Sequence, residues 1–345
     1  MLAVYTLEQA EQWDNIVRSF PRYDTYYLSG YVKAFQLHGD GEPLLFHYEK
    51  GETRGISVAM KRDVAHCEHF RGRVEEGQVF DLACPYGYGG WLIEGEDVDG
   101  LMAAYESWCR KNGIVSEFVR FHPVMENHQQ VENHYDVIPL GEVVTMDLTS
   151  PEVIWANISS KNRNMIRKAQ KNGIVIYSGR YPEIYRVFRE IYNSTMDKDN
   201  ATDYYYFSPE FYDSVLNDLP QNAQVFYAVW EDKIIAASIM LACDGKMNYH
   251  LSGSIREYAN LAPSNLLLYQ AALWGCANGC KSLYLGGGVG SGEDSLFKFK
   301  RAFYRGDDLY RFHIGKKVFN QEKYDELVAL REDLPEGGFF PRYRA

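Results

Sequence analysis

Apolar runs and polar turns follow one another in a regular order through the first part of the chain. Two apolar runs around Lys50-Gly51-Glu52 predict a β-hairpin, because strands that flank a short polar turn pair with each other. Apolar residues at helical spacing end before Asn112-Gly113, a pair typical of a left-handed helix end. The predicted elements are strands at 43–48, 55–60 and 79–84, a helix at 97–111 and a strand at 117–121.

The second part of the chain repeats this order. Glu231-Asp232-Lys233 separates two apolar runs and predicts another hairpin. Pro263 suits the first turn of a helix, and this helix is apolar on almost every side, which indicates burial on most faces. The predicted elements are strands at 225–230, 234–241 and 247–251, a helix from 263 to 277 and a strand at 282–285.

Two short phrases occur in both parts, in the same order. W-x3-N-G-x2-S begins at Trp108 and again at Trp274, and upstream of it D-x-Y-Y-[LF]-S begins at Asp24 and at Asp203. Ordered matches of this kind indicate one domain design used twice. Because ligands favour domain interfaces, we expect a binding cleft between the two copies.

The order of elements predicts an α/β (α+β) protein of two tandem domains. Each is expected to be a mixed, mostly antiparallel sheet flanked by helices, the arrangement of an acyltransferase-like domain. The expected boundaries are 1–142 for the first domain with its linker, 143–315 for the second domain, and 316–345 for a C-terminal strand, helix and tail.

Composition limits the function classes. The net charge is −11, whereas a general nucleic-acid binder is basic, so any RNA contact must be local and DNA is not an expected partner. The 6 cysteines form no dense disulfide framework. No apolar run approaches the roughly 18 residues of a membrane span, and the N-terminus lacks the pattern of a signal peptide. These features predict a cytoplasmic protein.

A predicted helix at about 151–171 is the clearest functional candidate. Arg163, Arg167 and Lys171 share one face, flanked by Lys161 and Lys168, while apolar residues occupy the opposite side. Such a basic face suits a phosphate-bearing substrate or an RNA end. A solvated surface helix is the alternative.

A glycine run at 286–292 precedes the phrase 296–303, which carries Lys298, Lys300 and Arg301. The run has neither the Walker nor the dinucleotide spacing. Glycines can still let the backbone approach a ligand, and the three cations could hold an anionic group or a developing oxyanion. The alternative is a mobile loop followed by a helix whose Phe residues pack inward.

Tyrosines are abundant and could line a sugar or peptide groove. Tyr205 and Tyr206 lie in an aromatic run, and Tyr249 lies on a predicted strand. With 27 tyrosines in the chain, most must be structural. His66, Cys67 and His69 have metal-ligand spacing but no matching second pair, so no metal is expected.

Several segments resemble the Fem-type peptidoglycan aminoacyltransferases, which have two tandem GNAT-like domains. The resemblance covers most of the chain and is strongest from about 144 to 312. The segments that carry it are 258–269, Gly279-Cys280-Lys281, the turn at Gly286, the helix around 161–169 and the phrase 299–303.

The resemblance implies that the chain moves an amino acid from aminoacyl-tRNA to an amine on the stem peptide of a peptidoglycan precursor. It implies no cofactor besides this donor, and charged tRNA and the precursor as partners, with peripheral contact to a lipid-linked precursor. By position, Lys300 matches a family lysine, with Lys298 nearby as a second catalytic candidate. Tyr249 matches a family aromatic residue, and Lys33 matches a lysine near the precursor phosphates.

The remaining candidates follow from the residues themselves. Arg163 and Arg167 are expected to anchor phosphates, and Tyr205 and Tyr206 to shape the acceptor groove together with the matched tyrosine. Asp81, at a strand end, is the candidate general base, and proton loss assisted by the substrate is the equal alternative.

Two other functions remain open. An acyl-CoA-dependent N-acyltransferase acting on a sugar or peptide amine would have a Q/R-x-x-G-x-G/A loop at a helix start, whereas this chain has Leu261-Ala262-Pro263-Ser264. A non-catalytic protein that binds the precursor or a glycan is the second alternative. The chain also departs from the family at 200–203, where an arginine that grips the nucleotide-linked precursor is missing.

Overall fold

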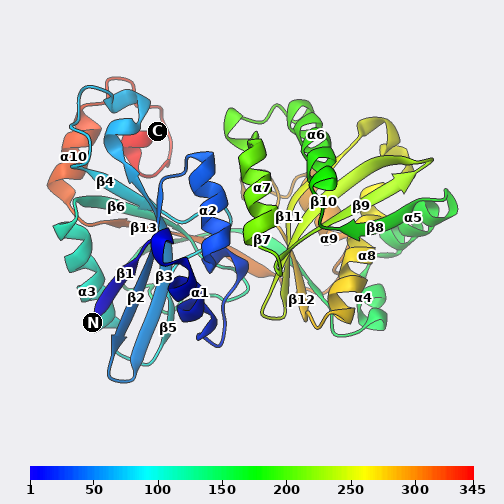
Figure 1. Ribbon diagram of the computed structural model, residues 1–345, viewed down its shortest axis with the longest axis horizontal. Helices are drawn as coiled ribbons and strands as arrows, with labels where there is room; N and C mark the ends of the chain where they lie inside the picture. Colours follow the sequence, from blue (N-terminus) through cyan, green and yellow to red (C-terminus); the bar gives the residue numbers. More distant parts are fainter. The chain divides into compact units, whose positions relative to one another are not determined.

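The computed structural model describes Met1–Ala345 and divides into two compact units (Figure 1). Unit 1 comprises Met1–Leu140 and Phe312–Ala345, and unit 2 comprises Gly141–Arg311. The C-terminal segment, expected to stand apart at 316–345, is therefore part of unit 1, and its Tyr343 is fully buried there. In Figure 1 the red C-terminal helix and tail accordingly lie among the blue and cyan elements of unit 1.

Unit 1 is a sheet flanked by helices. Its strands run in the spatial order β1-β2-β3-β4-β6-β13, and β5 pairs with β3. Its strands are β1 (Leu2–Tyr5), β2 (Glu42–Lys50), β3 (Thr53–Asp63), β4 (Phe80–Ala83), β5 (Leu92–Glu94), β6 (Ile114–Arg120) and β13 (Tyr310–Val318). Its helices are α1 (Ala10–Arg18), α2 (Ser29–His38), α3 (Val98–Lys111) and α10 (Gln321–Ala329).

Unit 2 has the same kind of sheet, in the order β8-β9-β10-β11-β12-β7. Its strands are β7 (Asp136–Asp147), which begins in unit 1, β8 (Val175–Gly179), β9 (Ala223–Trp230), β10 (Lys233–Cys243), β11 (Lys246–Ser254) and β12 (Ser282–Gly286). Its helices are α4 (Pro151–Asn157), α5 (Ser160–Lys171), α6 (Pro182–Lys198), α7 (Pro209–Asp218), α8 (Pro263–Ala277) and α9 (Ser295–Arg301).

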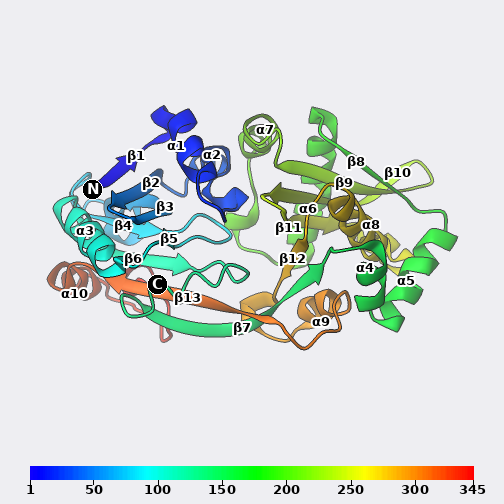
Figure 2. The same ribbon diagram turned by 90° about the horizontal axis from the view of Figure 1, so that it is seen from below.

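The two sheets have one topology. In each, the first four strands pair antiparallel, the fourth and fifth pair parallel (β4 with β6, β11 with β12), and a sixth strand closes the sheet antiparallel. The sixth strands are exchanged along the chain: β7, which follows β6, completes unit 2, and β13, which comes after β12, completes unit 1 (Figure 2). The expected α/β fold of mixed sheets flanked by helices is confirmed.

The repeated phrases have equivalent structures in the two units. The side chains of Asn112 and Asn278 each donate a 2.8 Å hydrogen bond to the carbonyl of the preceding tryptophan, at the end of α3 and of α8. Each tryptophan in turn meets a phenylalanine edge-on, Trp108 with Phe46 at 5.0 Å and Trp274 with Phe226 at 5.5 Å between ring centroids. The second strand of each unit supplies this phenylalanine.

The predicted helix at 151–171 is two helices. Ile158 and Ser159 are extended, and the Ser159 hydroxyl accepts a hydrogen bond from the Asn162 N–H at 3.3 Å, so Ser159 caps α5. Because this serine can satisfy an otherwise unpaired helix N–H, the chain breaks and restarts there. The linker expected at the end of the first domain, 1–142, ends in β7, which begins at Asp136.

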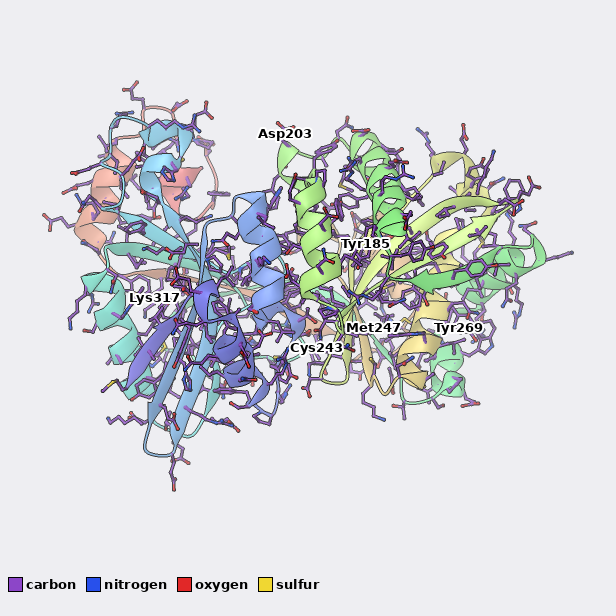
Figure 3. All side chains as sticks on the ribbon, in the orientation of Figure 1. Tyr185, Asp203, Cys243, Met247, Tyr269 and Lys317 are labelled. Atoms are coloured by element: carbon purple, nitrogen blue, oxygen red, sulfur yellow. The ribbon has the colours of Figure 1, made fainter.

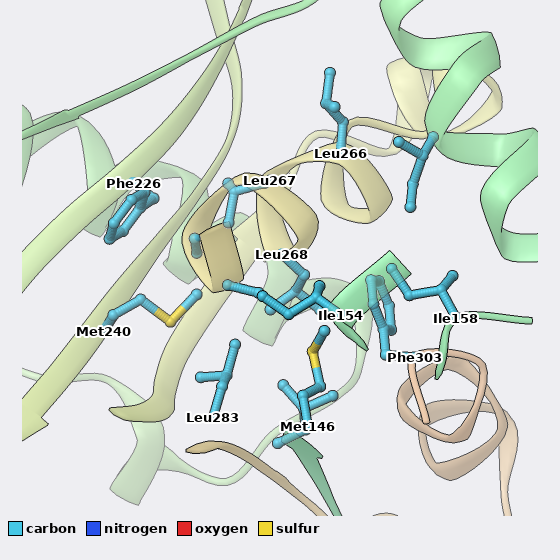
Figure 4. Packing of buried hydrophobic residues seen from close by; sticks show 14 of the residues in the cluster. Met146, Ile154, Ile158, Phe226, Met240, Leu266, Leu267, Leu268, Leu283 and Phe303 are labelled. Carbon is cyan, nitrogen blue, oxygen red and sulfur yellow. The ribbon is translucent and has the colours of Figure 1, made fainter. Parts of the chain in front are cut away.

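The core of unit 2 centres on α8. Leu267 and Leu268 lie among apolar side chains of the sheet and of α4, and Met247 and Tyr185 are also buried in this unit (Figures 3 and 4). This helix is apolar on nearly all sides, as predicted, because sheet and helices cover it together. None of the helices combines the length and the apolar character that crossing a membrane requires.

Candidate functional site

The parallel strands β11 and β12 of unit 2 share only a short ladder. Three residue pairs join them, from Lys246–Ser282 to Asn248–Tyr284, and β11 then continues to Ser254 while β12 ends at Gly286. Gly286 has a φ of +80°, a left-handed conformation that glycine adopts without a steric penalty. The chain therefore turns away from the sheet where the two strands separate, and the glycine-rich segment begins there.

Lys300 lies next to this strand end. Its ammonium nitrogen Nζ donates a 2.7 Å hydrogen bond to the Gly287 carbonyl, and a Cβ atom at Gly286 would lie 3.3 Å from it. Asp294 caps the helix that carries Lys300 by accepting a 2.8 Å hydrogen bond from the Phe297 N–H. The helix start and the glycine turn thus fix the position of the lysine.

Burial changes the acidity of this lysine. Lys300 is 9% exposed, and its burial lowers the pKa of the ammonium to about 8, against the opposing effect of the Asp294 carboxylate. At pH 7 the side chain is still mostly protonated. It is a partly desolvated cation with spare N–H donors, and such a group can stabilise negative charge that develops on a nearby oxygen.

Tyr249 lies on β11, immediately beyond the last residue pair of the short ladder. It packs against the core of unit 2, and burial raises the pKa of its hydroxyl, which therefore stays protonated at neutral pH. Its expected role in the acceptor groove stays a prediction.

Lys298 points elsewhere. It is exposed and lines an open hollow of about 570 Å³ together with Arg301 and Arg305. The other residues that line the hollow are Glu142, Ser159, Glu293, Phe297 and Ala302. Helix α9 thus separates the two lysines: one faces the glycine turn and the other faces the hollow.

The two arginines expected to anchor phosphates differ. Arg163 donates from one terminal nitrogen to the carbonyls of Trp155 and Ile158, at 3.3 and 3.0 Å, so it binds the end of α4 to α5. Arg167 is exposed and lies over the Trp155 ring, 5.1 Å from its centroid. The structure thus gives Arg163 a structural task, while Arg167 stands with Lys161, Lys168 and Lys171 on an exposed basic face.

The tyrosine candidates of the aromatic run lie outside this site. Tyr205 ends a short 3-10 helix between α6 and α7, Tyr206 follows it, and the Tyr206 hydroxyl donates a 2.7 Å hydrogen bond to Asp197 of α6. Lys33 lies on α2 of unit 1 and is exposed. The substrate-binding roles expected for these three residues remain predictions.

Asp81 has a structural environment rather than that of a general base. Its carboxylate is fully buried, pairs with Arg62 at 2.7 Å and with Arg344, and accepts a 3.0 Å hydrogen bond from the Tyr343 hydroxyl. Both carboxylate oxygens are thus engaged by side chains of the same unit, Oδ1 by Arg62 and Oδ2 by Tyr343 and Arg344. Asp81 ties the C-terminal tail to the sheet of unit 1.

Sequence reasoning overlooked two sets of residues. Asp24 and His122 form a buried pair in unit 1, with 3.0 Å between Oδ2 and Nε2, which links the first aromatic phrase to the end of β6. The other set is the hollow, where Arg305 joins two cations of α9. The spacing of Lys298 and Arg301 was the available signal, since positions three residues apart share a helix face, whereas Arg305 lies beyond the end of α9 and has no such signal. No group of three potential metal ligands is present.

The chain is similar to known proteins in one sequence segment and in its overall fold. The model of the acetyltransferase (GNAT) domain matches residues 158–301, while a search of curated proteins finds no match. The crystal structure of FemX superposes with a TM-score of 0.68 at 11% identity, covering 94% of this chain and 99% of that chain.

Two further solved structures share the fold. A conserved protein of unknown function from Bacteroides thetaiotaomicron has a TM-score of 0.60 at 10% identity, with 92% of this chain and 100% of that chain covered. The C-terminal domain of a protein described as a lysylphosphatidylglycerol synthetase, from Agrobacterium fabrum, has a TM-score of 0.55 at 15% identity, with 90% and 91% covered.

The expected Fem-type resemblance is therefore confirmed at the level of the fold, across the whole chain. The catalytic candidates Lys298 and Lys300 both fall within the matched domain. Residues 158–301 match the acetyltransferase (GNAT) domain, and the chain is an acyltransferase whose tandem GNAT-like fold is similar to that of FemX.

Proposed function

We propose that this acyltransferase moves an amino acid from aminoacyl-tRNA to an amine on the stem peptide of a peptidoglycan precursor. The observation that carries the proposal is the fold of the complete chain, which is that of FemX over 94% of its length. Because the likeness covers 94% of this chain, both units take part in it.

The start of α8 supports a donor other than acyl-CoA. A pyrophosphate bound at a helix start needs exposed backbone N–H groups. Here the first helical residue is Pro263, which has no N–H and is buried, and the preceding Ala262 is 2% exposed and left-handed. The Asn265 side chain donates a 2.7 Å hydrogen bond to Asn162 of α5, so the first turn of α8 packs against another helix. This leaves little access for a pyrophosphate.

The chemistry of such a transfer asks for alignment and charge stabilisation. The amine nitrogen attacks the ester carbonyl carbon, the carbon–oxygen bond to the tRNA ribose breaks, and an amide forms. The amine loses one proton and the ribose oxygen gains one. Alignment of the two reactants can lower the barrier by about 7–11 kcal/mol, and one oxyanion donor by roughly 3–4 kcal/mol.

In this scheme Lys300 is the oxyanion donor. Its Nζ lies beside the Gly286 turn, at the point where β11 and β12 separate, so a carbonyl oxygen placed there would meet a fixed cation. Tyr249 would border the same opening from β11. The cationic face of α5, with Arg167 over Trp155, would contact the RNA backbone.

The donor can be tested directly by thermal unfolding. Uncharged tRNA should raise the melting temperature of the protein, because a ligand that binds only the folded state stabilises it. Acetyl-CoA at millimolar concentration should leave the melting temperature unchanged. The opposite pattern, a shift with acetyl-CoA and none with tRNA, would replace the proposal with the acyl-CoA-dependent reaction.

A further inference from the structure

The hollow beside α9 has the features of an anion-binding site separate from Lys300. Three cationic side chains line it, Lys298 and Arg301 from the helix and Arg305 from the turn that follows. With a volume of about 570 Å³ it has room for a phosphate group and part of the molecule that carries it. Lys300, the catalytic candidate, points away from it toward the Gly287 carbonyl.

The arginines of the hollow are held in place without losing all their donors. Arg305 donates from one terminal nitrogen to the Ala156 carbonyl at 2.7 Å, and Arg301 donates to the Tyr304 carbonyl and lies 3.5 Å from Asp307. A guanidinium has five N–H donors, so each arginine keeps donors beyond these contacts. Anchored arginines lose little entropy when they bind an anion.

The start of α5 adds to the positive potential. Ser159, its N-cap, lines the hollow, and its N–H is bonded to the carbonyl of Ala302, which also lines it. The N-terminus of a helix carries about half a positive charge, which favours a nearby anion. Glu142 and Glu293 oppose this, so among the side chains that line the hollow three cations face two carboxylates, and Asp307, outside the lining, pairs with Arg301.

We propose that this hollow binds a terminal phosphate monoester of the acyl donor. A terminal phosphate has three unshared oxygens and close to two negative charges, so it can accept hydrogen bonds from several cations at once. A backbone phosphodiester has one charge and two such oxygens. If the donor is aminoacyl-tRNA, as the proposed function has it, the group is the 5′-phosphate at the end of the acceptor stem.

The inference rests on the proposed function only for the identity of the donor. Coenzyme A also has a phosphate monoester, on its ribose, so the same chemistry could serve an acyl-CoA donor. The experiment must therefore distinguish a phosphate site from no site, and RNA from coenzyme A.

The test uses four ligands and the full-length protein. An RNA minihelix that copies an acceptor stem is prepared with and without its 5′-phosphate, and coenzyme A is compared with dephospho-coenzyme A. Dissociation constants are measured by fluorescence anisotropy or calorimetry at fixed salt, because phosphate contacts depend on ionic strength. We expect removal of the 5′-phosphate to weaken minihelix binding roughly tenfold, with no measurable binding of either coenzyme.

Variants assign that difference to the hollow. Arg305→Ala should reduce the effect of the 5′-phosphate to less than about twofold, and so should Lys298→Glu, which alters only an exposed side chain and is not expected to disturb folding. Glu142→Gln should enlarge the effect, because it removes a carboxylate from the lining. Arg186→Ala, on exposed α6 surface, is the matched control for general loss of charge and should leave the effect unchanged.

The outcomes separate the two proposals. Minihelix binding that is equally tight with and without the phosphate, or a phosphate effect that survives both Arg305→Ala and Lys298→Glu, overturns the phosphate site and leaves the tRNA donor standing. A phosphate effect seen with coenzyme A alone, and lost in these variants, supports the site and overturns the tRNA donor. No binding of any ligand overturns both.

Discussion

At the scale of single residues, Lys300 is the side chain on which the proposed chemistry depends. Its ammonium is buried beside a glycine turn, where water screens its charge poorly, so it can act strongly on a nearby oxygen. The same burial makes the charge costly to the fold. Activity and stability should therefore respond in opposite directions when the charge is removed.

Replacing Lys300 with methionine should lower the rate of transfer by about 10²–10³-fold, the cost of one oxyanion donor. Steady-state kinetics with charged tRNA measure this change. Lys233→Met is the matched control, because this lysine is exposed at the start of β10 and belongs to no proposed contact with donor or acceptor. An unchanged rate for the Lys300 variant would reject the catalytic role.

The stability of the same variant has a predictable pH dependence. Because burial lowers the pKa of Lys300 from 10.5 to about 8, the folded state holds this proton less tightly than the unfolded state. The penalty is fully present below about pH 8 and disappears as pH rises toward 10.5. At pH 7 Lys300→Met should therefore raise the free energy of unfolding by about 1–3 kcal/mol, measured by urea denaturation. A variant that is less stable at pH 7 would contradict this account.

Glu117 should respond to pH in unit 1. Burial raises the pKa of its carboxyl to about 7, although the Tyr135 hydroxyl donates a 2.7 Å hydrogen bond to it. A raised pKa means that the folded state binds this proton more tightly, so its contribution to stability is full below pH 4.5 and is lost as pH rises through 7. The free energy of unfolding of Glu117→Gln, taken relative to that of the natural protein, should therefore rise by about 1–3 kcal/mol from pH 5 to pH 8. If the difference in unfolding free energy between the two proteins is the same at pH 5 and at pH 8, the raised pKa of Glu117 is wrong.

At the scale of elements, the duplicated helix ends offer a matched comparison. Gly113 and Gly279 follow α3 and α8 with φ values of +70° and +82°, where a side chain is strained. A Cβ atom at Gly113 would also lie 2.5 Å from the Gln78 carbonyl oxygen, whereas one at Gly279 meets nothing within 4 Å.

Gly279→Ala should therefore cost about 1 kcal/mol of unfolding free energy, and Gly113→Ala at least twice as much. Chemical denaturation of both variants measures the difference. If the two substitutions cost the same unfolding free energy, the close approach of the Gln78 carbonyl to position 113 does not affect stability.

Local elements could be predicted from the sequence because their signals are local. Both hairpins and both helix ends follow from turn residues and apolar spacing that lie within a few positions of each other. The break between α4 and α5 is not visible in the basic spacing; its signal in the sequence is Ser159, a residue type that caps helices and that caps α5 in the structure. Arg163 was expected to bind a phosphate because the basic spacing does not show this break. At the break, the carbonyls of Trp155 and Ile158 accept the hydrogen bonds of Arg163.

Contacts between distant segments were beyond local patterns. Asp81 lay at a predicted strand end and suggested a base, but its partners Tyr343 and Arg344 come from the far end of the chain. The sequence showed the duplication and not the exchange of the sixth strands, because the residues of β7 and β13 do not indicate which sheet they join, and their partners are fixed by the complete sheets.

At the scale of the whole molecule, the exchanged strands predict how fragments behave. Residues 141–311 contain every strand pair and the hydrophobic core of unit 2, so this fragment should fold cooperatively alone. Residues 1–140 lack β13, α10 and the buried Tyr343, so they should remain unfolded or aggregate. Circular dichroism during thermal unfolding tests both. A cooperative transition in the fragment 1–140 would show that the returning segment is dispensable.

The central claim is transfer from charged tRNA to an amine of a wall precursor. The most direct measurement incubates the protein with tRNA carrying an isotope-labelled amino acid and a lipid- or nucleotide-linked stem-peptide precursor, and follows the precursor by mass spectrometry. The account predicts a mass increase of one aminoacyl residue on the acceptor amine, which requires the protein and is lost in the Lys300→Met variant. A precursor whose mass stays unchanged with every charged tRNA, but increases by an acetyl group with acetyl-CoA, would contradict it.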